Sequence, residues 1–142
     1  MKASTKAIDL IKQFEGCVLT PYKDVGGVWT VGYGTTGAQV KQGVPWTQAQ
    51  AEEALQKRVD AISSILTTTI VPIITQNQLD ALTSLCYNIG QGAFRQSTCL
   101  RFMNQRQFAA AADQFLKWDH VNGVVVPGLL NRRQAERALF LA

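Results

Sequence analysis

The sequence pattern changes twice along the chain, and these changes limit the folds that it can adopt. Residues 17–37 mix strand-forming side chains with glycine, whereas the residues before and after them place apolar side chains at helical spacing. A short strand segment inside a helical chain predicts an α+β fold with a small antiparallel hairpin or three-stranded sheet. The strand formers are Tyr22, Val28, Trp29, Val31 and Tyr33, and the glycines are Gly26, Gly27, Gly32, Gly34 and Gly37.

Helices are predicted on both sides of this segment. The first is expected at about 4–14, because Ile8, Ile11 and Phe14 form one apolar stripe and Gly16 follows as a stop. Beyond the strand segment, two capping boxes, each a threonine followed by a glutamine three residues later, open two long helices. The later helices are expected at about 47–66, 75–90, 97–104, 108–118 and 131–141.

The chain has the size and composition of one folded domain. Of its 142 residues, 46% are hydrophobic and 17% are charged, which excludes a disordered chain. We expect a single domain over residues 1–142, with a β-lobe at about 15–45 and a helical lobe formed by residues 1–14 and 46–142. A cleft between two such lobes is the natural place for a functional site.

Several functional classes have no support in the sequence. The chain has one histidine, His120, and neither a phosphate-binding Gx4GK[ST] motif nor a GxSxG motif. Its three cysteines, without a CxxC pair, argue against a disulfide framework and a zinc site, and predict buried apolar thiols. We therefore expect neither a metal nor a cofactor.

Charge and terminal pattern constrain the partner and the compartment. A formal net charge of +4 suits a polyanion, either nucleic acid or an anionic cell-wall polymer. No apolar run is long enough to span a membrane, and the N-terminal residues lack the apolar stretch of a secretion signal. We expect synthesis in the cytoplasm, without export by that route and without membrane insertion. The densest arginines, with Glu136 among them, also fit a solvated helix face: Arg132, Arg133 and Arg137.

Two carboxylates near the predicted lobe boundary are candidates for chemistry. Glu15 stands at the end of the first helix, and Asp24 and Thr30 follow in the strand segment. A solvent-facing glutamate and a turn aspartate explain this spacing without any function. The functional alternative is that the two carboxylates share general acid–base work.

The hairpin loop decides whether Asp24 and Thr30 act together. A three-residue loop at 25–27, with Gly27 in the left-handed region, pairs Tyr22 with Thr30 and leaves Asp24 on the same face. A two-residue loop would place Asp24 and Thr30 on opposite faces. Function therefore requires the longer loop.

These residues resemble the catalytic spacing of the phage-type lysozymes of glycoside hydrolase family 24, which is Glu15, eight residues, Asp24, five residues, Thr30. Neighbouring segments are similar to the same family and span nearly the whole chain in family order. They are 14–16, 21–24, 29–35, 77–82, 87–90, 127–129, 132–133 and 136–140. The resemblance implies a lysozyme-like fold with its active-site cleft between the lobes.

The resemblance also implies a reaction and roles for the acidic residues. The family cuts the β-1,4 bond between N-acetylmuramic acid and N-acetylglucosamine in peptidoglycan. Glu15 would be the general acid, Asp24 would stay ionised and orient a water, and Thr30 would help to hold that water. We expect inversion, with the two carboxylates about 6.5–9.5 Å apart.

Further site residues follow from the same resemblance. Arg132 is expected to pair with Glu15, whereas Tyr87, Asn88 and Gln114 are expected to contact sugars. Thr35 stands where many relatives carry histidine, so any pairing of that histidine is missing here. We interpret His120 as a surface residue and Cys17 as structural.

Three functions remain compatible with the sequence. The resemblance implies a monomeric enzyme that acts on peptidoglycan strands in the periplasm, released by a holin-type partner, without nucleic acid. A lytic transglycosylase would cut the same bond but release an anhydro sugar. A catalytically silent module that binds cell wall or nucleic acid is the alternative from another class. A phage or prophage enzyme and a secreted antibacterial effector would look alike.

Overall fold

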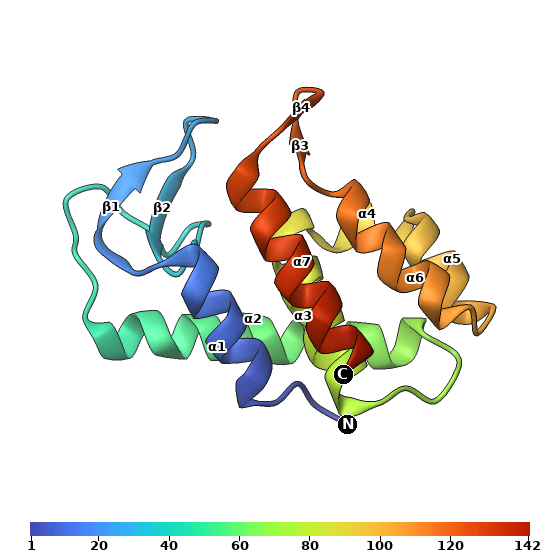
Figure 1. Cartoon of the computed structure of the whole chain (residues 1–142). Coiled ribbons are helices and arrows are strands. Elements are labelled where there is room, and N and C mark those ends of the chain that lie inside the picture. Colours follow the sequence, from blue (N-terminus) through green and yellow to red (C-terminus); the bar gives the residue numbers. More distant parts are fainter.

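A computed structural model describes all residues from Met1 to Ala142. A small β-lobe is attached to a larger helical body, and the long helix α2 extends beneath both (Figure 1). This confirms the expected α+β fold. In chain order the elements are α1 (Thr5–Glu15), β1 (Val18–Lys23), β2 (Trp29–Gly32), α2 (Gln48–Thr69), α3 (Gln76–Ile89), α4 (Gln91–Arg95), α5 (Thr98–Asn104), α6 (Phe108–Gln114), a 3-10 turn (Phe115–Lys117), β3 (His120–Val121), β4 (Val124–Val125) and α7 (Pro127–Leu141).

The β-lobe is an antiparallel hairpin with the register that the longer loop predicts. Tyr22 pairs with Thr30, and the Asp24 N–H donates to the Val28 carbonyl at 2.9 Å. Gly27 has φ +79°, the left-handed conformation that closes such a loop without steric cost. A single bridge between Val31 and Thr35 adds a third short segment. Asp24 and Thr30 therefore face the same way.

The helical body is organised around α3. Its residues from Leu79 to Tyr87 are all buried, and the helix packs against α1, α2 and α7. Burial of each large aliphatic side chain here stabilises the fold by about 1.5–3 kcal/mol. Both long helices begin with complete capping boxes, at Thr47 with Gln50 and at Thr75 with Gln78, as the sequence predicts.

A buried aspartate on α3 fixes the start of α1. Asp80 Oδ1 accepts from the Ser4 N–H at 2.7 Å, and Asp80 Oδ2 accepts from the Ser4 hydroxyl at 2.5 Å. Two free donors at a helix start are thereby satisfied by a side chain. The opposite end of the same helix carries Glu15, so this cap helps to place Glu15 against the helical body.

The structure differs from several of the helices expected from the sequence. Helix α2 continues to Thr69 rather than ending near 66, because its backbone hydrogen bonds continue until the Ile70 N–H donates to the Leu66 carbonyl at 2.9 Å. The five-residue helix α4 was not predicted. The last helix begins at Pro127 rather than near 131, since proline suits the first turn of a helix.

The helical lobe contains a second hairpin that the sequence reading missed. Strands β3 and β4 are joined by Asn122 and Gly123, which have φ +51° and +79°. Two successive left-handed residues form the tight turn that suits a two-residue hairpin. His120 is exposed in β3, next to Asp119.

The three cysteines differ in burial. Cys86 and Cys99 are buried, as predicted, but Cys17 is exposed, so the expectation of three buried thiols is wrong. Cys17 follows the glycine that ends α1, where the chain turns away from the body.

Every helix falls short of the combined length and apolarity that crossing a membrane demands.

Candidate active site

Glu15 is the last residue of α1, where the helical body meets the β-lobe. Gly16 ends the helix at φ +66°, and its N–H donates to the Lys12 carbonyl. The backbone then turns directly into β1, so the Glu15 side chain projects at the junction. That side chain is 20% exposed, which leaves it accessible while most of its surface is covered.

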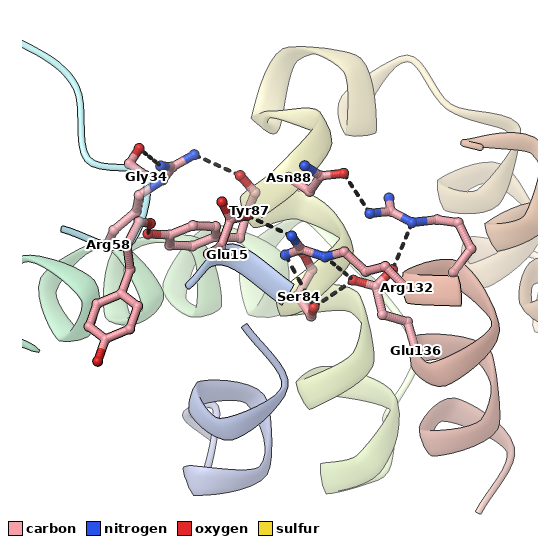
Figure 2. Close-up of polar contacts among 10 residues, drawn as sticks. Glu15, Gly34, Arg58, Ser84, Tyr87, Asn88, Arg132 and Glu136 are labelled. Atoms are coloured by element: carbon pink, nitrogen blue, oxygen red, sulfur yellow. Dashed lines mark hydrogen bonds and ion pairs between the residues drawn. The ribbon is translucent and has the colours of Figure 1, made fainter. Parts of the chain in front are cut away.

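Arg132 of α7 binds Glu15 from the helical side (Figure 2). Its Nη1 donates to Glu15 Oε2 at 2.6 Å, which confirms the expected pair. Nε donates to Glu136 Oε2 at 3.1 Å, and Nη2 donates to the Ser84 carbonyl at 3.1 Å. The arginine is only 3% exposed, and three acceptors fix its guanidinium plane.

The β-lobe approaches Glu15 through Gly34. A Cβ atom at this position would lie 2.9 Å from Glu15 Oε1, closer than real Cβ contacts allow. Gly34 also has φ +81°, a conformation that favours glycine. The Glu15 carboxyl thus has Arg132 at Oε2 and the backbone of Gly34 at Oε1.

Arg58 of α2 ties the β-lobe to α3 beside this junction. Its Nη2 donates to the Tyr87 carbonyl at 2.7 Å, Nη1 lies 3.5 Å from the Gly34 carbonyl, and the guanidinium stacks on the Tyr87 ring at 3.9 Å. The Tyr87 hydroxyl in turn donates to the Tyr33 carbonyl at 2.5 Å. These contacts fix the position of Gly34 relative to Glu15.

Asp24 and Thr30 lie on one face of the hairpin. Asp24 Oδ1 accepts from the N–H groups of Gly26 and Val28, each at 2.9 Å, and no hydrogen bond of the chain engages Oδ2. The buried Thr30 hydroxyl donates to the Val28 carbonyl at 2.9 Å, so towards a water it acts as an acceptor. The loop therefore holds the Asp24 carboxylate in one orientation with an oxygen to spare.

The three residues expected to contact sugars have different environments. Tyr87 is 2% exposed, and burial raises the pKa of its phenol, so in this structure its ring packs in the core and offers no surface to a sugar. Asn88 is exposed, and its Oδ1 accepts from Arg133 Nη2 at 2.5 Å. Gln114 is half-buried at the end of α6.

Sequence reasoning missed the buried polar residues beneath Glu15. Arg132, Arg133 and Glu136 are all buried, so the alternative of a solvated helix face is wrong for this turn of α7. Burial raises the pKa of the Glu136 carboxyl, and the two guanidinium groups oppose that effect. The sequence did contain a signal for this ion-pair cluster. Glu136 follows Arg133 by three residues and Arg132 by four, which puts all three on one side of the helix.

Sequence reasoning also assigned no role at the site to Arg58 or to Gly34, although Gly34 lies in a segment that resembles the family. A hollow of about 330 Å³ opens beside them, lined by Thr35, Thr36, Gln39, Ala54, Lys57 and Arg58. Hydroxyl, amide and cationic side chains in such a hollow suit a polar ligand.

No group of histidine, cysteine, aspartate and glutamate side chains is arranged to hold a metal ion.

Comparison with known proteins matches almost the entire chain. The profile of the Phage lysozyme family matches residues 12–136. An endolysin of Acyrthosiphon pisum secondary endosymbiont phage 1 is 43% identical over 144 residues, which cover 99% of this chain and 98% of that protein. The solved muramidase domain of SpmX from Asticaccaulis excentricus has a TM-score of 0.92 at 35% identity, over 99% of this chain and 98% of that one. A mutant of P22 lysozyme has a TM-score of 0.87 at 37% identity, over 100% and 99%.

Proposed function

We propose that this chain, which belongs to the phage lysozyme family, hydrolyses the β-1,4 bond between N-acetylmuramic acid and N-acetylglucosamine in peptidoglycan. The coarser activity follows from the family and from the endolysin relatives: the chain is a peptidoglycan-lytic enzyme. The observation that best supports the finer proposal is the placement of Glu15, which is held between Arg132 and Gly34 where the lobes meet.

Glu15 is the proposed general acid. A general acid must be held within hydrogen-bond reach of the leaving oxygen in a fixed orientation. Arg132 fixes Oε2 at 2.6 Å, and the close approach of Gly34 limits the freedom of Oε1. The partly covered position keeps bulk water away from the proton during transfer, while a side chain that is 20% exposed still admits a glycan.

Asp24 and Thr30 are proposed to deliver the water. The Asp24 carboxylate is fixed through Oδ1 by two backbone N–H groups, so Oδ2 is available to accept a proton from a water. Thr30 on the same face offers a hydroxyl acceptor to that water. The negative charge of Asp24 also stabilises positive charge that develops on the sugar ring in the transition state.

The proposal includes inversion at the anomeric carbon. In an inverting hydrolase the water attacks from the face opposite to the leaving group, so a β-linked substrate first yields an α-configured reducing sugar. Proton NMR of the first product, recorded before mutarotation, distinguishes the two outcomes. An α-anomer is expected, and an initial β-anomer would indicate retention with Asp24 acting as a nucleophile.

Sugar contacts are proposed at two amide side chains, the exposed Asn88 and the half-buried Gln114. Asn88 presents its Nδ2 group outward, because Arg133 binds its Oδ1, and Gln114 offers a second amide on α6. N-acetyl carbonyls and hydroxyls are the acceptors that such donors bind. Asn88→Ala and Gln114→Ala variants are each expected to raise KM for soluble glycan strands about threefold to tenfold, because each variant loses one hydrogen bond to the substrate.

Glu15→Gln tests the proposed role of the acid. Purified peptidoglycan is incubated with the native chain, with this variant, and with Glu53→Gln as a control for an exposed glutamate of α2. Native chain and control are expected to release soluble muropeptides, whereas Glu15→Gln should lose at least about 10²-fold in rate. Unchanged circular dichroism and thermal unfolding show that the fold is retained. Equal release by Glu15→Gln would contradict the proposal.

Two alternatives predict different outcomes of the same digestion. A lytic transglycosylase releases 1,6-anhydromuramic acid and needs no water, so Asp24→Asn would leave its rate almost unchanged. A silent binding module pulls down peptidoglycan without releasing fragments. If binding to DNA explains the +4 charge, its affinity should fall steeply as salt rises.

The proposed setting is a monomer that acts on the wall after release by a holin-type partner. Size-exclusion chromatography with light scattering is expected to give the monomer mass of 15.6 kDa. Co-expression with a membrane-permeabilising protein is expected to trigger lysis, whereas expression of the chain alone is not. Lysis by the chain alone would contradict the need for a release partner.

A further inference from the structure

Two buried arginines share one glutamate on α7. Arg133 and Glu136 are each 0% exposed, and Arg132 is almost as buried. A buried guanidinium is costly unless a carboxylate and hydrogen-bond acceptors surround it. The glutamate follows Arg132 by four residues and Arg133 by three, so one helical turn brings all three together.

Both oxygens of the Glu136 carboxylate face cations or donors (Figure 2). Oε2 accepts from Arg132 Nε at 3.1 Å and from the Ser84 hydroxyl at 2.5 Å, whereas Oε1 forms an ion pair with Arg133 Nε at 3.1 Å. The two guanidinium groups can only donate to these oxygens, whereas the Ser84 hydroxyl can donate or accept. Burial raises the pKa of Glu136, and the two guanidinium groups at its oxygens oppose that effect and favour the carboxylate.

This contact determines which part of Arg132 reaches Glu15. Its Nε is held by Glu136 and its Nη2 by the Ser84 carbonyl, so Nη1 is the group left to bind Glu15 Oε2 at 2.6 Å. Without Glu136, the guanidinium could turn about its stem, and Glu15 would lose a fixed partner. Arg133 Nε, Arg133 Nη1 and Glu136 Oε1 are all buried without a hydrogen-bond partner. The charge of Arg133 is therefore balanced by the ion pair of its Nε with Glu136 Oε1 at 3.1 Å, while its Nη2 donates to Asn88.

We propose that Glu136 is a positioning residue for glycan hydrolysis, because it orients Arg132 against Glu15 and balances the charge of both arginines beneath the acid. This inference rests on the proposed role of Glu15 as general acid. Glu136 does not touch the substrate in this proposal. It acts through Arg132, and its effect is therefore both geometric and electrostatic.

Among the four residues joined by ion pairs, the charges balance when both Glu15 and Glu136 are ionised. Two carboxylates, Glu15 and Glu136, lie with two guanidinium groups, Arg132 and Arg133. Removing the Glu136 charge leaves Glu15 as the only carboxylate beside two guanidinium groups, which favours its ionised form, the form that cannot donate a proton. The groups that face this cluster from other elements include Ser84, Tyr87 and Asn88 of α3, Arg58 of α2 and the backbone of Gly34 in the β-lobe.

A charge series on α7 tests the inference. Glu136→Gln adds one net positive charge to the cluster, Arg133→Met removes one, and the double variant restores zero. The measurements are the pH dependence of muropeptide release and the pH titration of the Glu15 carboxyl by ¹³C NMR. Glu136→Gln should move the high-pH fall in activity and the Glu15 titration to lower pH, because the added positive charge favours the ionised carboxyl. Arg133→Met should move them the other way, and the double variant should return close to the native midpoint.

A neutral variant separates charge from packing. Ser84→Ala removes a hydrogen bond to Glu136 without changing any charge, so it should lower the rate without moving either midpoint. Thermal unfolding of each variant shows whether it is folded. If Glu136→Gln does not fold, the other two variants still test the inference. Arg133→Met should move both midpoints to higher pH, and the double variant should return them close to the native values.

The outcome separates this inference from the proposed function. The NMR titration does not depend on turnover, so it tests the coupling between Glu136 and Glu15 even if the native chain releases no muropeptides. Midpoints that do not respond to the charge series would overturn the role of Glu136. Midpoints that respond in a chain without hydrolysis would overturn the proposed reaction alone.

Discussion

Arg132 Nη1 lies 2.6 Å from Glu15 Oε2, which joins the last helix of the chain to the end of the first. The two residues are 117 positions apart in sequence, so the pair forms only when the helical body is assembled. Helix α3 lies against both helices and supplies the Ser84 carbonyl that completes the binding of the guanidinium. Folding of the body and positioning of the acid are therefore coupled.

Arg132→Met is expected to lower both stability and activity. Breaking a buried pair leaves the carboxylates of Glu15 and Glu136 without their shared cation, a cost of about 3–5 kcal/mol. Arg137→Met is the matched control on the same helix, because its pair with Asp113 is largely exposed and contributes less than about 1 kcal/mol. Urea denaturation of both variants measures the difference. Equal losses would show that the Arg132 pair contributes no more than a surface contact.

Gly34→Ala is expected to displace the Glu15 carboxyl. The added Cβ would meet Oε1 at 2.9 Å, and the backbone strain at φ +81° adds about 1–2 kcal/mol. Gly43→Ala carries the same strain at φ +77° but has nothing within 4 Å of the new atom. We expect both variants to be destabilised and only Gly34→Ala to lose more than about tenfold in muropeptide release. A similar loss of activity in Gly43→Ala would assign the effect to strain alone.

Asp24→Asn and Asp24→Ala separate the charge of this residue from its part in the loop. The asparagine amide oxygen can accept from the same N–H groups of Gly26 and Val28, so the hairpin should persist while water activation is lost. Alanine removes the acceptor as well. Amide hydrogen exchange at Gly26 and Val28 should be slow in Asp24→Asn and faster in Asp24→Ala, with activity lost in both. Full activity in Asp24→Asn would remove the aspartate from the reaction.

The three thiols are expected to differ in reactivity. Burial raises the pKa of Cys86 to about 11 and that of Cys99 to about 12, so at pH 8 no more than roughly one in a thousand of either is the reactive thiolate. Cys17 is exposed. Titration of the native chain with a disulfide reagent at pH 8 should therefore modify one thiol rapidly and all three after unfolding. As the pH rises toward 11, Cys86 should begin to react before Cys99.

Rapid modification of three thiols in the folded chain at pH 8 would contradict the burial of Cys86 and Cys99. The Cys17→Ser variant is the control. It should show no rapid reaction in the native state and two reactive thiols after unfolding.

Local sequence signals predicted the parts of the fold that local geometry determines. For the first hairpin the sequence left two loops open, and the structure has the three-residue loop with a left-handed Gly27, which puts Asp24 and Thr30 on one face. The capping boxes at Thr47 and Thr75 placed the starts of the long helices correctly. The Asn122-Gly123 pair carried an equally strong hairpin signal, flanked by valines, and should have predicted β3 and β4.

Burial of polar side chains was harder to predict, because it depends on tertiary contacts. Arg132, Arg133 and Glu136 have the spacing of an exposed, salt-bridged helix turn, and only packing against α3 buries them. Tyr87 ends an apolar stripe, and the same spacing suits a core aromatic and a residue at a site. The close approach of Gly34 to Glu15 depends on how the lobes meet, which no local pattern describes.

Mass spectrometry of peptidoglycan fragments, digested in ¹⁸O-labelled water, tests the central claim most directly. Hydrolysis at muramic acid predicts reducing-end N-acetylmuramic acid that carries one ¹⁸O atom, produced by the native chain and not by Glu15→Gln. Fragments that end in 1,6-anhydromuramic acid without label would contradict water delivery by Asp24, and the absence of cleavage by the native chain would contradict the proposed hydrolysis itself.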